Sequence, residues 1–102
     1  MNQYKDVVQI APELHEVVFE NSKVRIIKAT LPPSTKLPLH VHPAHIFIVI
    51  KGSKVRVKGA DDSREIDVSD GTVGEGDTNP HTVENIGNSA VEEYLIEFKN
   101  AG

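Results

Sequence analysis

Short runs of β-branched and aromatic residues, separated by turn residues, recur along this chain and constrain its fold more than any other feature. The runs are Val17–Glu20, Val24–Ala29, Ile46–Ile50, Val55–Val57, Glu65–Val68 and Glu93–Phe98. No stretch repeats apolar residues at helical spacing for more than about one turn. Strands and turns that alternate every eight to twelve residues or so are typical of antiparallel sandwiches and barrels. We therefore predict an all-β fold.

Length and composition exclude several classes of protein. The 102 residues suffice for one domain, residues 1–102, and 38% hydrophobic with 25% charged residues is ordinary for a soluble globular chain. The absence of cysteine excludes disulfides, thiolate metal sites and cysteine nucleophiles. A net charge of -4 argues against a nucleic-acid partner. The longest apolar run, Ile46–Ile50, is too short for a membrane span, and the N-terminus lacks a secretory apolar region, so we expect a cytoplasmic protein.

Two of the runs differ in their patterns. Glu93–Phe98 alternates, with Tyr94, Ile96 and Phe98 on one face and Glu93, Leu95 and Glu97 on the other, which predicts a strand with one buried face. Ile46–Ile50 does not alternate, so both of its faces should be covered.

A second copy of the protein is the simplest cover for the outer face of Ile46–Ile50. We therefore predict a homodimer whose interface includes Ile46, Ile48 or Ile50. The alternative is that Tyr4–Leu14 folds back over that face. Residues 1–12 have weak periodicity and are expected to form an arm along the outside of the sheet.

Four of the five histidines point to a metal site. In a strand, His40 and His42 lie on the same side, with Cβ atoms roughly 6–7 Å apart. A turn at Pro43-Ala44 then returns His45 beside them, and His81 joins from a later strand. Imidazole is the commonest protein ligand of divalent transition metals, and three imidazoles with open positions form a reactive site. His15 stands apart and is interpreted as structural.

The same residues resemble the two motifs of the cupin family. The segment from Leu37 to Gly52 resembles the first motif, G(X)5HXH(X)3–4E(X)6G, and residues 71–85 resemble the second, G(X)5PXG(X)2H(X)3N. The residues that carry the match are His40, His42, Gly52, His81 and Asn85. The resemblance covers residues 30–99. It implies an antiparallel double-stranded β-helix, or jelly-roll barrel, of six to eight strands, with a metal ion inside.

The chain departs from the family pattern at several positions. His45 stands seven residues before Gly52, where the family usually has a metal-binding glutamate. Ser34 occupies the place of the leading glycine, Gly76-Asp77 stands where Pro-x-Gly would begin, and Thr78 replaces the glycine before His81. The resemblance therefore implies His40, His42, His81 and, in place of the glutamate, His45 as the ligands.

Four neutral ligands would leave the ion its full charge. Such a site should favour an anionic further ligand, and iron, nickel, zinc or copper rather than manganese. If His45 does not bind, a three-histidine site remains, which resembles that of cupin thiol and diketone dioxygenases.

Other residues add little chemistry. Phe47 and Val49 share the parity of His45 and should line the cavity, which suits a small organic acid or diketone. Asn85 is expected to fix a turn. Glu75, Asp77 and Thr78 are interpreted as solvated loop residues.

Two functions follow for the metal site. One is a metal-dependent enzyme of the dioxygenase or isomerase kind. The other is a non-catalytic module that binds or senses a small ligand. The intact histidine groups argue against a third, metal-free structural domain.

Overall fold

The computed structural model describes residues 6–76 and 78–99. Within this part of the chain there are nine strands and one short helix. The helix is α1 (Val7–Ile10), and the strands are β1 (His15–Glu20), β2 (Val24–Leu31), β3 (Lys36–His40), β4 (His45–Lys51), β5 (Lys54–Lys58), β6 (Ser63–Asp67), β7 (Val73–Glu75), β8 (His81–Asn85) and β9 (Val91–Phe98). The all-β prediction is confirmed, although nine strands exceed the six to eight that the resemblance implied. No helix in the described residues is long and apolar enough to cross a membrane.

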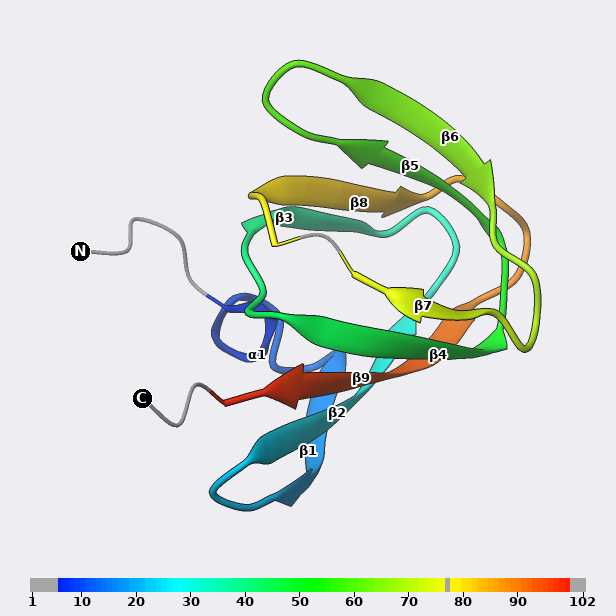
Figure 1. Ribbon diagram of the computed structural model, residues 1–102. Coiled ribbons are helices and arrows are strands. Elements are labelled where there is room, and N and C mark those ends of the chain that lie inside the picture. The colour runs from blue at the N-terminus through cyan, green and yellow to red at the C-terminus, as the bar shows by residue number, and fades with distance from the viewer. Residues whose placement is uncertain (1–5, 77, 100–102) are drawn as a thin grey trace.

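The strands form two antiparallel sheets that face each other (Figure 1). One has five strands in the order β1-β2-β9-β4-β7, and the other has four in the order β3-β8-β5-β6. Neighbours in both sheets are mostly far apart in sequence, as in β2 with β9 and β3 with β8. This is the double-stranded β-helix arrangement that the motifs implied.

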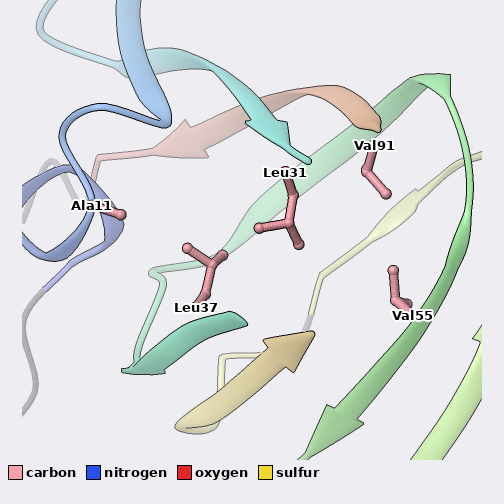
Figure 2. Packing of buried hydrophobic residues seen from close by; sticks show 5 residues of the cluster. All are labelled: Ala11, Leu31, Leu37, Val55 and Val91. Atoms are coloured by element: carbon pink, nitrogen blue, oxygen red, sulfur yellow. The ribbon is translucent and has the colours of Figure 1, made fainter. Parts of the chain in front are cut away.

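The apolar core joins the two sheets (Figure 2). Leu31 and Val91 come from the five-stranded sheet, Leu37 and Val55 from the four-stranded sheet, and Ala11 from the segment after α1. All five side chains are buried. The sheets are therefore held together by small and branched aliphatic side chains, which suits a chain with so few aromatic residues.

The N-terminal segment enters the core, which corrects the expectation of an arm along the outside of the sheet. Val7 is buried against Ile27, Ala29 and Leu95 on the inner face of the five-stranded sheet. The Oδ1 atom of Asp6 caps α1 by accepting hydrogen bonds from the two backbone N–H groups at positions 8 and 9. The alternative to a dimer required this segment to cover the outer face of β4, and its described part lies on the inner side instead. Tyr4 lies outside the described residues.

The buried face of β9 is the one that carries glutamates. Leu95 and Glu97 are buried, whereas Phe98 on the other face is 44% exposed. The outer face of the five-stranded sheet instead carries an apolar row, because Phe19, Ile26, Ile96 and Ile46 lie side by side across four strands. One-face burial is confirmed for β9, and its polar side chains are the ones that reach the interior.

Candidate metal centre

Three histidines from distant parts of the chain meet inside the barrel. The ligand atoms of His40, His42 and His81 all lie within 4.8 Å of one another. His40 pairs directly with His81 across β3 and β8, and their ring centroids are 4.7 Å apart. His42 follows the end of β3, with its ring 5.0 Å from that of His40. The predicted convergence is confirmed, although β3 ends at His40, so His42 is placed by the loop and not by strand parity.

A hydrogen-bond acceptor fixes one ring nitrogen of each histidine in this cluster. Nδ1 of His40 lies 2.7 Å from the carbonyl oxygen of Pro38, and Nδ1 of His81 lies 2.7 Å from that of Asn79. A carbonyl oxygen can only accept, so each Nδ1 carries the proton and each Nε2 keeps its lone pair. This arrangement orients imidazoles that bind metals through Nε2.

His42 is held by a buried carboxylate instead of a carbonyl group. Its Nδ1 lies 3.3 Å from Oε2 of Glu97, which is only 2% exposed. Oε1 of the same carboxylate accepts hydrogen bonds from Nε and Nη2 of Arg25 at 2.9 and 2.6 Å. Nη2 of Arg25 also lies 3.7 Å from Oδ2 of Asp6. The network therefore runs from the helix cap, through the half-buried Arg25 and the buried Glu97, to a candidate ligand.

His45 lies beside the cluster with its free nitrogen turned towards Gly76. Its ring centroid is 4.6 Å from that of His42, and its Nδ1 lies 2.8 Å from the carbonyl oxygen of Pro43. A Cβ atom on Gly76 would lie 1.8 Å from Nε2 of His45, so only glycine leaves room for the ring in this position. His45 is not one of the three histidines whose ligand atoms lie mutually within 4.8 Å. Its role as a fourth ligand stays a prediction.

Burial favours the neutral form of His40 and His42, which is the form that binds metal. Desolvation lowers the pKa of His40 to about 4, against the hydrogen bond to Pro38 and with help from the nearby His42 and His81. Desolvation also lowers the pKa of His42, although the hydrogen bond to Glu97 opposes it. For Glu97, burial alone would raise the pKa, but the hydrogen bonds from His42 and Arg25 outweigh it and hold the pKa below its usual range.

A cavity of about 470 Å³ opens from the histidines into the barrel. All four predicted ligands line it, as do Phe47 and Val49, which confirms the expected apolar wall. A cavity of this size accommodates a small organic molecule. Two exposed charged residues, Arg64 and Glu75, also line it and mark its solvent side.

Glu75 therefore borders the cavity, which sequence reasoning did not favour. Thr78 is exposed and does not line the cavity, in agreement with a solvated loop residue. Asp77 lies outside the described residues.

His15 is buried and borders the same cavity. Its Nδ1 lies 2.9 Å from the carbonyl oxygen of Ala11, so it has a partner that the sequence did not reveal. Among the described residues, it does not belong to the group that could hold a metal ion.

Asn85 fixes a turn, as expected. Its Nδ2 donates hydrogen bonds to the carbonyl oxygens of Leu31 and Ser89, and its Oδ1 accepts from Ser53 and from the backbone of Gly87. These four bonds connect the turn after β8 to the end of β2 and to the turn before β5, so the Asn85 side chain has a structural role.

Two inward-facing glutamates were missed by sequence reasoning. Glu97 supports His42, and Glu93 lines the cavity on the same face of β9. The available signal was the alternation of Glu93–Phe98, which placed both on one face with Leu95. Because two glutamates usually indicate a solvated face, that signal did not suggest a place in the site.

The comparisons with known proteins agree on the fold. No family model matches the sequence, and no curated protein matches it either. Among solved structures, a cupin domain from Bordetella pertussis Tohama I is similar over 98% of this chain and 99% of that one, with a TM-score of 0.79 and 16% identity.

Two further cupin structures support the same assignment. A Cupin 2 conserved barrel domain protein from Salinispora arenicola has a TM-score of 0.68 at 16% identity, over 90% of this chain and 81% of that one. An RmlC-like cupin from Methanocaldococcus jannaschii has a TM-score of 0.67 at 16% identity, over 86% and 81%. The chain therefore has the cupin fold. More narrowly, it is a small cupin-fold protein with a buried histidine cluster that could hold a metal ion.

Proposed function

We propose that this protein binds a divalent transition metal ion through Nε2 of His40, His42 and His81 and binds a small organic anion in the adjoining cavity. The observation that carries the proposal is the fit of the cluster to a metal. The three rings converge, and each has its Nδ1 occupied by an oxygen acceptor. His45 is the candidate fourth ligand.

The charges around the cluster favour an anionic ligand. Arg25 offsets the charge of Glu97, and an imidazole that keeps its proton on Nδ1 and binds through Nε2 is a neutral ligand, so a divalent ion would keep its full charge. An imidazole donor set favours iron, nickel, zinc or copper over manganese. The bound ion would supply a Lewis-acid centre that attracts a carboxylate or enolate oxygen. Phe47, Val49 and Leu95 would surround the rest of the ligand with apolar surface.

Metal analysis of the purified protein tests the first half of this proposal. We expect about one equivalent of a divalent transition metal in the wild type, and loss of that metal in His40→Ala and His81→Ala. His15→Ala is the matched control, because His15 is a buried histidine of the same cavity outside the cluster. Equal metal content in all four proteins would overturn the proposed ligand set.

The proposed metal site also suggests a class of reaction. We propose a dioxygenase- or isomerase-like reaction on a small organic acid or diketone; a non-catalytic binding module is the alternative. Oxygen uptake by the iron-loaded protein, measured with diketones, thiols and keto acids, tests for dioxygenase activity. Proton exchange into the same keto acids, followed by NMR in deuterated water, tests for isomerase chemistry. Inactivity in both assays, with retained ligand binding, would favour the binding module.

We also propose that a second copy of this chain covers the outer face of the five-stranded sheet. Phe19 and Phe98 on that face are 52% and 44% exposed, and Ile50 is 46% exposed. Together with the row of isoleucines across β2, β9 and β4, they form an apolar surface. A sheet face of this kind can pair with itself about a two-fold axis.

A further inference from the structure

Glu93 is a carboxylate inside an apolar part of the barrel. Its neighbours on the inner face of the sheet are Ala29 on β2, Val49 on β4, and Val91 and Leu95 on its own strand. All four of these neighbours are apolar and buried. Glu93 lines the cavity, so its side chain points inward from this apolar surround.

None of the described residues forms a hydrogen bond or ion pair with Glu93. Every fully enclosed side-chain oxygen in the described residues has a hydrogen-bond partner. Because Glu93 has no such partner, its carboxylate oxygens must be open to the cavity that it lines. Burial alone raises the pKa of Glu93 to about 7. An unpaired carboxylate costs stability, so its presence calls for a partner from outside the chain.

The arginine and the isolated histidine that line the cavity are engaged elsewhere, and Glu75 is a further carboxylate on its exposed side. Arg64 is exposed and forms an ion pair with Asp62 at 3.5 Å. His15 stands in the same cross-strand row as Glu93, beyond Ala29, and its Nδ1 bonds to Ala11. The histidine cluster and Glu97 lie towards the other end of β9, and the Cα atoms of Glu93 and Glu97 are about 13 Å apart at the usual rise of a strand.

We propose that Glu93 binds a hydrogen-bond donor, a hydroxyl or an amine, at the far end of a ligand whose anionic end lies at the histidine cluster. This inference rests on the proposed function and names its substrate class: a small linear molecule with an oxygen anion at one end, an apolar middle, and a hydroxyl or amino group at the other. Glu93 recognises the ligand in this arrangement and takes no part in chemistry at the metal.

Paired probes test this two-ended recognition. Calorimetry measures the affinity of zinc-loaded protein for hexanoate and for its ω-hydroxy and ω-amino derivatives. The same three compounds based on butanoate and on octanoate show which chain length fits the cavity. We expect the ω-substituted member of the best-fitting set to bind at least tenfold more tightly than the unsubstituted acid. Glu93→Leu should abolish the preference. Glu93→Gln, which keeps an oxygen acceptor but no charge, should keep the preference for hydroxyl and lose that for amine.

Glu92→Gln is the matched control, because Glu92 lies next in sequence and faces the other side of β9. It should bind all probes as the wild type does, and all variants should take up zinc equally. A wild type without preference for the ω-substituted probes, or a preference that survives in Glu93→Leu, would overturn the inference.

Failure of the metal proposal is separable from failure of this one. Hexylamine and hexanol lack the anionic end, so their binding to metal-free protein tests Glu93 alone. We expect at least fivefold tighter binding of hexylamine to the wild type than to Glu93→Leu. Equal affinities would overturn the role of Glu93 whether or not the protein binds zinc.

Discussion

Nδ1 of His42 lies 3.3 Å from the carboxylate of Glu97, 55 positions later in the chain. The usual glutamate ligand of the first cupin motif is absent here, since His45 stands in its place. Glu97 therefore brings a carboxylate to the cluster as a support for a ligand. A carboxylate behind a histidine fixes the ring and makes its free nitrogen a stronger donor.

Glu97→Gln should weaken metal binding without removing it. The amide keeps an oxygen acceptor but loses the charge that strengthens His42 as a donor, so we expect a loss of about 10- to 100-fold in zinc affinity. Competition with a chromogenic chelator measures it. Glu84→Gln, which breaks an ion pair with Arg56 outside the cavity, should bind zinc as the wild type does. Equal affinity of both variants would show that Glu97 does not support the site.

Metal should stabilise the folded protein. A ligand that binds only the folded state at a hundred times its dissociation constant adds about 2.7 kcal/mol. We therefore expect zinc to raise the melting temperature by several degrees and a chelator to reverse the rise. His81→Ala should show no response to zinc, because one of the three converging rings is gone. A zinc response in His81→Ala equal to that of the wild type would contradict the proposed ligands.

Glu93 should make the protein less stable as the pH rises. Its pKa is about 7 in the folded state, and a free glutamate has a pKa of about 4.3. Below pH 4 the carboxyl is protonated in both states and costs nothing. Between pH 4 and 7 the unfolded state releases its proton first, so the free energy of unfolding falls by something on the order of 3 kcal/mol.

Urea unfolding of metal-free protein from pH 4 to 8 measures this effect. The stability of Glu93→Gln relative to wild type should rise with pH by that amount, since titration of all other groups is common to both proteins. The Glu92→Gln curve should run parallel to that of wild type. A pH-independent difference between Glu93→Gln and wild type would contradict the unpaired state of Glu93.

Gly52→Ala should destabilise the fold strongly. A Cβ atom at Gly52 would lie 1.8 Å from the backbone oxygen of Val68, and backbone cannot move aside as a side chain can. We expect a loss of roughly 3 kcal/mol or more, as for other steric overlaps in packed regions. Gly71→Ala is the comparison: Gly71 has φ +81° and open space around it, so the cost should be only about 1–2 kcal/mol. Equal losses in urea unfolding would contradict the close approach at Gly52.

Ile48→Asp and Ile50→Asp should shift the protein from dimer to monomer. Both side chains lie on the outer face of β4, where a charge would have to be buried at the proposed interface. Light scattering after size exclusion measures the mass. Leu39→Asp places the same charge on an exposed apolar residue of the other sheet and should leave the dimer intact. A monomeric wild type would contradict the interface.

The strands and the histidine cluster could be predicted because their signals are local. Each predicted run overlaps an observed strand, although Val68 lies beyond the end of β6 and no run was predicted for β7. The HxH spacing with a later histidine identified the rings that meet. His42 shows the limit of this reasoning, because its position depends on a loop and on Glu97 from the last strand.

The inward glutamates and the path of the N-terminal segment could not be predicted for a different reason. Both depend on which face of the five-stranded sheet is inside. On β9 the more apolar face, with Tyr94, Ile96 and Phe98, is turned outward, and the face with Glu93 and Glu97 is turned inward. Alternation identifies two faces but does not say which is enclosed. That requires knowledge of the opposite sheet, whose partners are far away in sequence.

Asp6 both caps α1 and pairs with Arg25, the residue that grips the carboxylate behind His42. The start of the described chain is thus linked, through Arg25 and Glu97, to the His42 ring inside the barrel. Loss of the Asp6 carboxylate would leave Arg25 held by Glu97 alone and should lower the affinity for metal. Recombinant versions of this protein that differ only at the amino end should therefore differ in how firmly they retain an ion during purification.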